Sequence, residues 1–196
     1  MAAPQSVSQR PRGLTVLRVH ITGASGSGTS TLGKAFAEAA GANWLDLDDF
    51  YWLPTSPPFQ SKRPKAERLA LLIDRIREST DVVVSGSLVE WGREVEDGWD
   101  LIVFLSAPTP VRIGRLRARD MARDGSVNPA FLTWAERYDD PDFTGRSRAL
   151  HERWLAQRSS RILRLDAELP LAKLVVALRK ASQALRDDPF ARPQRS

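Results

Sequence analysis

The sequence contains no cysteine, and this absence removes several kinds of chemistry at once. A disulfide framework, a thiolate nucleophile and a cysteine-ligated metal site are all excluded. Histidine is almost as scarce. His20 and His151 are far apart in the sequence, and neither belongs to a recognisable group of metal ligands, so we interpret both as structural. Any chemistry at this protein's site therefore depends on hydroxyl, carboxylate and cationic side chains.

Long apolar runs are also missing. No stretch approaches the roughly 20 apolar residues that a membrane-spanning helix needs, so no membrane partner is expected. The opening residues, MAAPQSVSQRPRG, lack the apolar segment of a secretory signal. We therefore expect a cytoplasmic protein. A length of 196 residues suits one substantial core and is short for two.

Acidic residues are outnumbered by basic ones, 24 against 29, which gives a net charge of +5. Residues 1–13 and 183–196 carry three of these positive charges, so the body of the chain is only mildly basic. Both ends are polar and contain proline. We expect disordered tails at 1–13 and 187–196 around a single domain at 14–186.

Short apolar runs alternate with helical patterns along the chain. Strands are predicted at 17–23, from 42 until the sequence becomes polar at Asp46, and at 81–87, 100–107 and 161–166. Helices are predicted at 29–41, about 64–79, after Pro110 and at 170–186. The more polar residues 120–150 are expected to form a helical lid insertion. This order predicts a three-layer α/β/α fold with a five-stranded parallel sheet.

Polar or glycine-containing segments follow four of these strands, at Gly23, Asp46, Ser85-Gly86 and Ser106. In parallel α/β sheets the ligand crevice lies at the carboxyl ends of the strands. The shared position of the four segments therefore predicts one binding site.

The segment GASGSGTST, residues 23–31, matches the phosphate-binding pattern G-x-x-x-x-G-K-[ST] at every position except one. In this pattern backbone N–H groups and a helix N-terminus converge on phosphate oxygens, and the final hydroxyl, here Ser30, holds Mg²⁺. The residues predicted to bind the phosphates are Gly23, Ser25, Gly26, Ser27, Gly28, Thr29, Ser30 and Thr31.

The missing residue is the lysine, which Thr29 replaces. Loss of one preorganised donor typically lowers a rate by about 10² to 10³, so either the site is catalytically weak or another cation acts there. Lys34 lies roughly 140° around the helix and ~7.5 Å further along it, which excludes it as the main substitute. Better candidates are the arginines of RIGRLRARD (112–120), or Lys62 and Arg63 on a mobile segment.

Carboxylates come from the segment LDLDD, residues 45–49. A kinase-type site needs an acid for Mg²⁺ and a base or orienting group near the accepting hydroxyl. In an extended segment residues two apart face the same side, so Asp46 and Asp48 are expected to project together. Asp49 then faces the other way or begins the next turn. Helix capping by Asp48 or Asp49 is the structural alternative.

The arginine-rich helix places Arg112, Arg115, Arg119 and Arg123 on one face by their i+3 and i+4 spacing. Guanidinium groups suit phosphate recognition, and we predict that Arg115 and Arg119 act near the lid. A solvated face paired with Asp120 and Asp124 is the alternative. The residues predicted to bind the acceptor are Asp49, Tyr51, Arg63, Trp91 and Arg93. Aromatic residues of a minor core would give the same pattern.

Four segments, GASGSGTST, LDLDDFY, VVVSGS and RLRARD, resemble in this order the shikimate kinase and nucleoside monophosphate kinase branch of P-loop NTPases. Adenylate-kinase-like small P-loop proteins are the most similar group. The resemblance implies ATP, Mg²⁺ and phosphoryl transfer, with Asp48 as base or orienting group and Asp46 near the metal. It further implies that an arginine of RLRARD clamps phosphates from a lid. The family has lysine at position 29, whereas this chain has threonine.

The favoured interpretation is therefore an ATP- and Mg²⁺-dependent kinase of a small molecule, with a nucleotide or nucleoside acceptor ahead of a metabolite hydroxyl. The alternative is a nucleotide-binding regulatory or interaction protein with little turnover, which Thr29 supports. A third interpretation is an RNA-associated protein that uses the basic helix and tails. No nucleic-acid-binding motif accompanies these charges, so nucleic acid is not the expected partner.

Overall fold

Five parallel strands form one sheet in the computed structural model, which describes residues 17–56 and 58–187. The order across the sheet is β2-β3-β1-β4-β5. The strands are β1 (Arg18–Gly23), β2 (Asn43–Asp46), β3 (Val82–Ser85), β4 (Leu101–Ser106) and β5 (Arg161–Asp166). In the centre, Val19 of β1 is in register with Val83 of β3 and Leu101 of β4. The predicted α/β fold with a five-stranded parallel sheet is confirmed.

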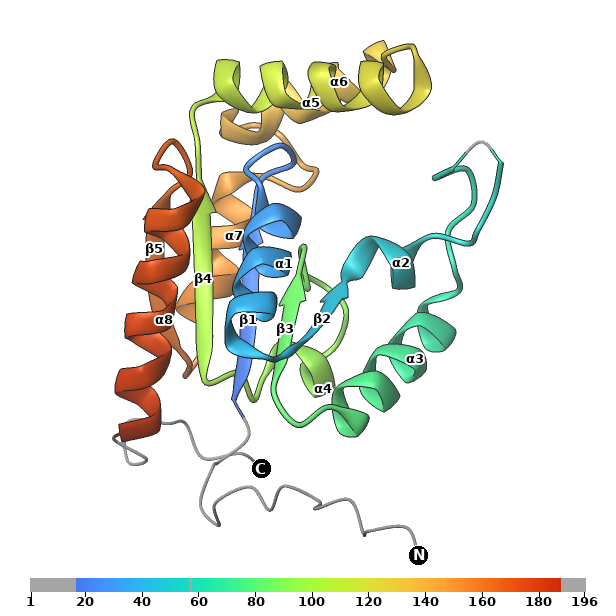
Figure 1. The fold of residues 1–196 in the computed structure, drawn as a ribbon. Coiled ribbons are helices and arrows are strands. Elements are labelled where there is room, and N and C mark those ends of the chain that lie inside the picture. The colour runs from blue at the N-terminus through green and yellow to red at the C-terminus, as the bar shows by residue number, and fades with distance from the viewer. Residues whose placement is uncertain (1–16, 57, 188–196) are drawn as a thin grey trace, which may run out of the picture.

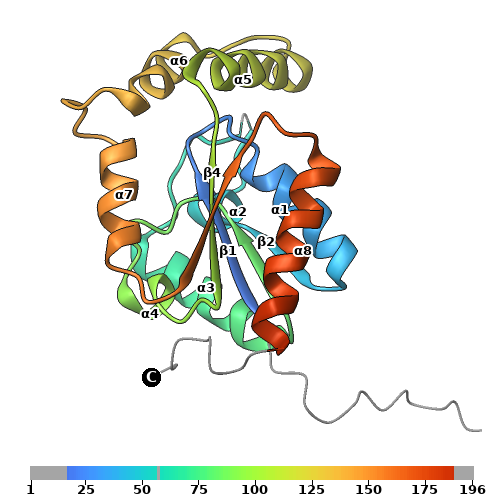
Figure 2. The ribbon, with the colours of Figure 1, turned by 90° about the vertical axis from the view of Figure 1, so that its left-hand side faces the viewer.

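Helices cover both faces of this sheet (Figures 1 and 2). On one face lie α1 (Thr29–Ala40) and α8 (Leu171–Asp187), and on the other α3 (Lys65–Glu78), α4 (Arg93–Glu96) and α7 (Arg148–Ala156). Each layer has its own apolar cluster against the strands: Leu32 and Leu178 belong to the first, and Leu72 and Leu155 to the second. The strands are buried on both sides, which explains their nearly continuous apolar sequences.

Two further helices lie across the carboxyl ends of the strands, α5 (Thr109–Asp124) and α6 (Pro129–Glu136) (Figures 1 and 2). Ile113 and Leu116 of α5 pack with Leu132 and Ala135 of α6 in a small separate cluster. The 3-10 helix η1 (Arg137–Asp139) and a loop then lead to α7. The region predicted as a helical lid is thus mostly helical. That it acts as a lid over the site stays a prediction.

A short helix, α2 (Leu47–Tyr51), follows β2 directly and was not predicted. The Asp46 carboxylate caps it, because its Oδ1 accepts the backbone N–H of Asp48 at 3.0 Å. The expectation that the backbone stays extended through Asp48 is therefore wrong. The capping residue is Asp46, not Asp48 or Asp49.

The predicted tails at 1–13 and 187–196 lie outside the described residues, except for Asp187, the last residue of α8. No helix within the described ranges combines the length and apolar character needed to cross a membrane.

Candidate active site

The last residues of the first four strands are Gly23, Asp46, Ser85 and Ser106, as the sequence predicts. Parallel pairing brings these ends to one edge of the sheet, where Asp46 is in register with Ser85. The buried hydroxyl of Ser85 accepts a hydrogen bond from the Trp44 indole at 3.0 Å. The edge therefore combines a glycine-rich loop, a carboxylate and hydroxyl groups.

The loop between β1 and α1 has the backbone of a phosphate cradle. Gly26 and Gly28 adopt φ angles of 81° and 96°, which favour glycine over other residues. A Cβ at Gly23 would lie 2.3 Å from the carbonyl oxygen of Leu105, so the close approach of β4 also requires glycine there. Ser27 closes the turn, with its N–H donating to Ala24 O at 3.0 Å.

The N-terminus of α1 is open. Gly28 is its N-cap and provides no side-chain hydrogen bond, and the first turn contains no acidic residue. The first N–H groups of a helix have no acceptor within it and carry partial positive charge. Thr29, Ser30 and Thr31 begin this helix, so the segment fits an anion such as a phosphate group.

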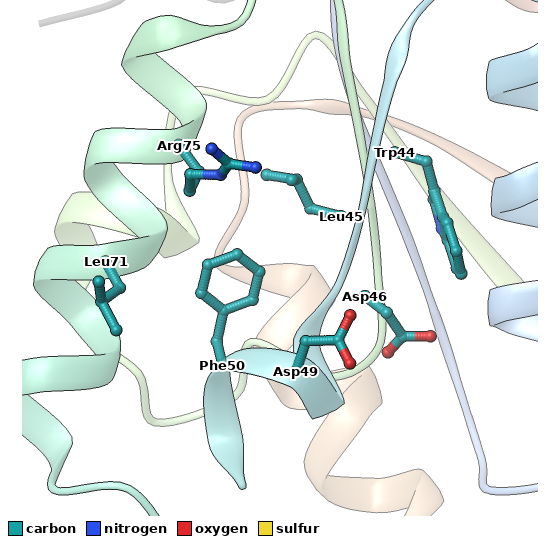
Figure 3. Close-up of a pocket in the computed structure, with 7 residues that line it drawn as sticks. All are labelled: Trp44, Leu45, Asp46, Asp49, Phe50, Leu71 and Arg75. Atoms are coloured by element: carbon teal, nitrogen blue, oxygen red, sulfur yellow. The ribbon is translucent and has the colours of Figure 1, made fainter. Parts of the chain in front are cut away.

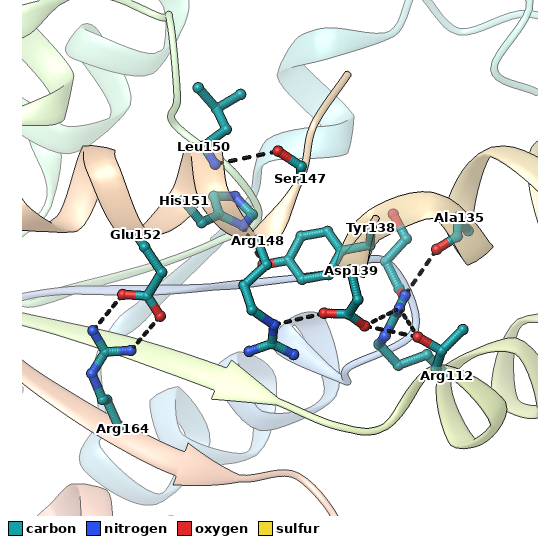
Figure 4. Close-up of polar contacts among 12 residues, drawn as sticks. Arg112, Ala135, Tyr138, Asp139, Ser147, Arg148, Leu150, His151, Glu152 and Arg164 are labelled. Carbon is teal, nitrogen blue, oxygen red and sulfur yellow. Dashed lines mark hydrogen bonds and ion pairs between the residues drawn. The ribbon is translucent and has the colours of Figure 1, made fainter. Parts of the chain in front are cut away.

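Two arginines of α5 bond to the backbone of the loop. Arg112 is fully buried, and it donates to Ser25 O at 3.4 Å and to Ala135 O at 3.1 Å (Figure 4). Its Nη2 pairs with Asp139 at 3.2 Å. Arg115 donates to Ser27 O at 3.4 Å and also to Ala167 O on the loop after β5. These guanidinium groups hold loop carbonyls and act as anchors of the cradle.

Arg146 contacts the loop through a side chain. Its Nη2 donates to Ser25 Oγ at 2.8 Å, and its guanidinium lies over the Trp134 ring, 5.2 Å from the centroid. Burial lowers the pKa of Arg146, while the charge of Asp48 acts in the opposite direction. The sequence reasoning missed this residue, although the turn signal DDPDFTG directly precedes it.

Asp48 lies near both Asp46 and Arg146. Its pKa is raised, first by partial removal of water and then by the Asp46 charge, while Arg146 and Arg119 lower it. The pKa of Asp49 is also raised, by desolvation and then by Asp46. Arg119 bonds Asp120 through two nitrogens, at 3.0 and 2.8 Å, and its side chain is half exposed. Asp48 is therefore coupled electrostatically to the predicted metal ligand Asp46 and to two cations.

Asp46 and Asp49 also line a small pocket of about 350 Å³ at the β2 edge of the sheet (Figure 3). The remaining lining residues are Trp44, Leu45, Phe50, Leu71 and Arg75. No group of three or more His, Cys, Asp or Glu residues that would hold a metal ion exists in the described part of the chain. Mg²⁺ characteristically takes one or two carboxylates together with substrate phosphates, and Asp46 with Ser30 offers a donor set of that kind.

Of the predicted acceptor residues, the structure brings Tyr51 and Trp91 together. The Arg68 guanidinium lies 4.5 Å from the Tyr51 ring centroid and 4.7 Å from that of Trp91. Trp91 is only 3% exposed and belongs to the core, as the structural alternative predicted. Arg63 donates to Phe50 O at 3.1 Å and to Glu67 at 2.6 Å.

Arg93, which was also predicted to bind the acceptor, does not join the Tyr51–Arg68 contact. It begins α4, which lies near the amino ends of the strands in Figure 1. Its side chain is 91% exposed, and the nearest ion pair is to Asp97 at 3.5 Å. On α5, Arg123 pairs with Asp124 at 2.6 Å. This matches the alternative interpretation of the arginine-rich helix, a solvated face paired with aspartates.

Both histidines are buried, in keeping with structural roles. His20 Nδ1 donates to Val84 O at 3.2 Å, and burial lowers its pKa to about 3. His151 lies between the Tyr138 hydroxyl at 2.7 Å and the Ser87 hydroxyl at 3.0 Å. Its pKa is also lowered to about 3, first by burial and then by the charge of Arg146. Both rings are therefore neutral in the folded protein near pH 7.

Comparison with known proteins shows which family and which folds this chain resembles. The model of a family described as AAA domain matches residues 19–128. The uncharacterized protein YqaC of Bacillus subtilis (strain 168) is 38% identical, over 76% of this chain and 87% of its own length.

Solved structures of kinases share the fold. A gluconokinase from Sinorhizobium meliloti 1021 superposes with a TM-score of 0.55 at 21% identity, covering 90% of this chain and 97% of its own. A shikimate kinase from Acinetobacter baumannii gives 0.55 at 16% identity, with 87% and 94% covered. A deoxyadenosine kinase from M. mycoides gives 0.57 at 9% identity, with 86% and 100% covered. The fold is that of the P-loop kinases.

Proposed function

This chain belongs to the family that the AAA domain model describes, and from that membership and the site we propose that it is a small-molecule kinase that transfers a phosphoryl group from ATP. The observation that carries the proposal is the open N-terminus of α1 behind the loop 23–28, with Asp46 at the end of β2 and Asp48 in α2 at the same edge of the sheet. The fold shared with gluconokinase, shikimate kinase and deoxyadenosine kinase supports it.

The phosphates of ATP would be held by backbone N–H groups of residues 24–30 and by the dipole of α1. Ser30 and Asp46 would hold Mg²⁺, whose charge offsets that of the phosphate oxygens when it is bound. Arg112 and Arg115 keep the loop carbonyls turned toward α5. Because these contacts join protein groups to one another, they hold the shape of the cradle, and a preorganised cradle lowers the cost of ordering it on binding.

Asp48 would orient the accepting hydroxyl and take its proton. A carboxylate suits this role better when its pKa lies above the ordinary value, and desolvation together with Asp46 raises the pKa of Asp48. Arg115 and Arg119, the predicted lid arginines, lie on α5 above the carboxyl ends of the strands (Figure 1). Arg119 is near enough to Asp48 to lower its pKa, which supports a role for Arg119 beside the transferred group.

The acceptor would bind beside α2, where the partly exposed Tyr51 contacts Arg68 above the buried Trp91. A nucleotide or nucleoside suits the aromatic ring and the cation there, and a metabolite hydroxyl is the next choice. A regulatory or interaction protein that binds nucleotide with little turnover is the second candidate function. Thr29 at the lysine position favours it, because that position ordinarily supplies a cation to the phosphates.

Two measurements test the proposal. ATP affinity is measured by calorimetry with and without Mg²⁺, and ATP consumption is then followed against a panel of nucleosides, nucleotides, sugar acids and other hydroxyl compounds. We expect Mg²⁺-dependent binding and turnover that requires one acceptor class. Binding without acceptor-dependent turnover would support the regulatory alternative, and absence of nucleotide binding would refute both.

A further inference from the structure

We propose that Arg146 supplies the cation that the phosphate loop lacks at position 29, so that the loop is a complete phosphate site assembled from two distant segments. This inference rests on the proposed function. It starts from the one departure of the loop from its pattern, a short uncharged threonine where a lysine would reach the phosphates.

Arg146 is the guanidinium that reaches a side chain of the loop. Its Nη2 bonds the Ser25 hydroxyl at 2.8 Å, although the two residues are 121 positions apart in the chain. Ser25 is part of the turn whose N–H groups face a bound phosphate in loops of this type. A cation fixed on this side chain therefore lies at the rim of the cradle.

The charge of Arg146 is available for a ligand. Within residues 17–56 and 58–187 it forms a hydrogen bond to Ser25 and a ring contact with Trp134, but no ion pair with a carboxylate. A guanidinium has five N–H donors, so those not used by Ser25 can contact phosphate oxygens. Asp48 interacts with it electrostatically from the acceptor side. Arg146 thus contacts the cradle at Ser25 and is coupled electrostatically to the predicted base, which suits a group that stabilises the charge of a transferred phosphoryl group.

The cations that the sequence suggested are engaged in other contacts or are exposed. Arg112 and Arg115 bond backbone carbonyls, and Arg119 forms two hydrogen bonds with Asp120. The remaining three are Arg117, which is exposed on α5, Arg63, which pairs with Glu67, and Lys62, which is exposed and lies 5.7 Å from the Tyr51 ring centroid. Ser25 itself is a second specific feature, because its hydroxyl positions the Arg146 guanidinium against the loop.

The test combines substitutions at the two positions and reads ATP affinity by calorimetry in the presence of Mg²⁺. Arg146→Gln keeps a planar polar tip but removes the charge, and Arg146→Lys keeps the charge. Arg153→Gln removes the same charge from an exposed position on α7 and is the matched control. Thermal unfolding of each variant without ligand establishes that the fold is retained.

We expect Arg146→Gln to weaken ATP binding by about tenfold or more, and Arg146→Lys to recover most of that loss. Thr29→Lys should raise ATP affinity more in the Arg146→Gln variant than in the natural chain, because the two cations would serve the same phosphates. We expect the gain in the Arg146→Gln variant to be about ten times the gain in the natural chain.

Two results would overturn the inference. One is equal ATP affinity in Arg146→Gln and Arg153→Gln. The other is an equal gain from Thr29→Lys with and without Arg146. In either case the natural chain still binds ATP, so the proposed function stands. If the natural chain binds no ATP, the proposed function and this inference fail together.

Discussion

Replacement of Arg112 by methionine is expected to destabilise the fold and to weaken nucleotide binding together. Arg112 is fully buried, and it donates to the carbonyls of Ser25 and Ala135, the hydroxyl of Thr109 and the carboxylate of Asp139. Methionine has a similar length and fills much of the same space, but it donates no hydrogen bond. The change therefore removes the link between the phosphate loop and the segment formed by the end of α6 and η1.

The size of the effect follows from what each acceptor retains. Asp139 keeps hydrogen bonds from Arg148 at 2.6 Å and Thr109 at 2.8 Å, and Ala135 O keeps the N–H of Arg137. The Nε of Arg112 is buried and has no hydrogen-bond partner among the described residues. Methionine lacks this N–H group, so the substitution also removes the cost of burying it unpaired. The loss should therefore be about 2–3 kcal/mol, below the roughly 3–5 kcal/mol typical when a buried partner is left uncompensated. For a chain of this size, that lowers the unfolding midpoint by roughly 4–12 °C.

Urea and thermal unfolding followed by circular dichroism measure this loss. Arg117→Met, at an exposed position of the same helix, is the matched control. Calorimetry on both variants should show the larger loss of ATP affinity in Arg112→Met, because only that change releases the Ser25 carbonyl. An unfolding free energy within about 0.5 kcal/mol of the control would refute the reasoning.

Two further predictions concern protonation. The pKa of Asp48 is raised above the ordinary value of 3.8, and only the ionised carboxylate accepts a proton. The acceptor-dependent rate should therefore increase with pH, and the midpoint of this increase should lie above pH 3.8. Asp48→Asn should abolish that increase and lower kcat by about 10² to 10⁴, whereas an unchanged pH profile would contradict the assigned role. Burial lowers the pKa of His20 and of His151 to about 3 in the folded protein, against 6.5 for a free histidine. As the pH falls below 6.5, the two imidazole rings therefore take up protons in the unfolded chain but not in the folded one. Urea unfolding at several pH values should therefore show stability falling toward acid, with His20→Gln reducing the slope by up to about 1.4 kcal/mol per pH unit, and an unaltered slope would count against a neutral buried ring.

Sequence reasoning located the strands and the phosphate loop because their signals are local. β5 and the end of β1 at Gly23 have the predicted bounds, since continuous apolar runs and glycine mark them within a few residues. The loop could be recognised in the same way, because its glycines serve a conformation confined to six residues.

The features that were missed depend on tertiary contacts. α2 forms because the Asp46 side chain turns back on the Asp48 N–H, whereas alternation alone favoured an extended backbone there. Arg146 carries no pattern of its own, and its relevance appears only when α5, α6 and η1 bring the following loop over Ser25. Trp91 and Arg93 illustrate the opposite case. They are near neighbours in the sequence, yet the core buries the first and solvent surrounds the second.

The parts of the phosphate cradle leave the ribosome at different times. Ser25 and Ser27 are synthesised 87 and 88 residues before the α5 arginines that bond their carbonyls, and Ser25 precedes Arg146 by 121 residues. A nascent chain that ends before Arg112 carries the glycine-rich loop without these anchors. Emergence of the loop alone therefore does not complete the contacts of the proposed site, which form only after the segment before α7 has been translated.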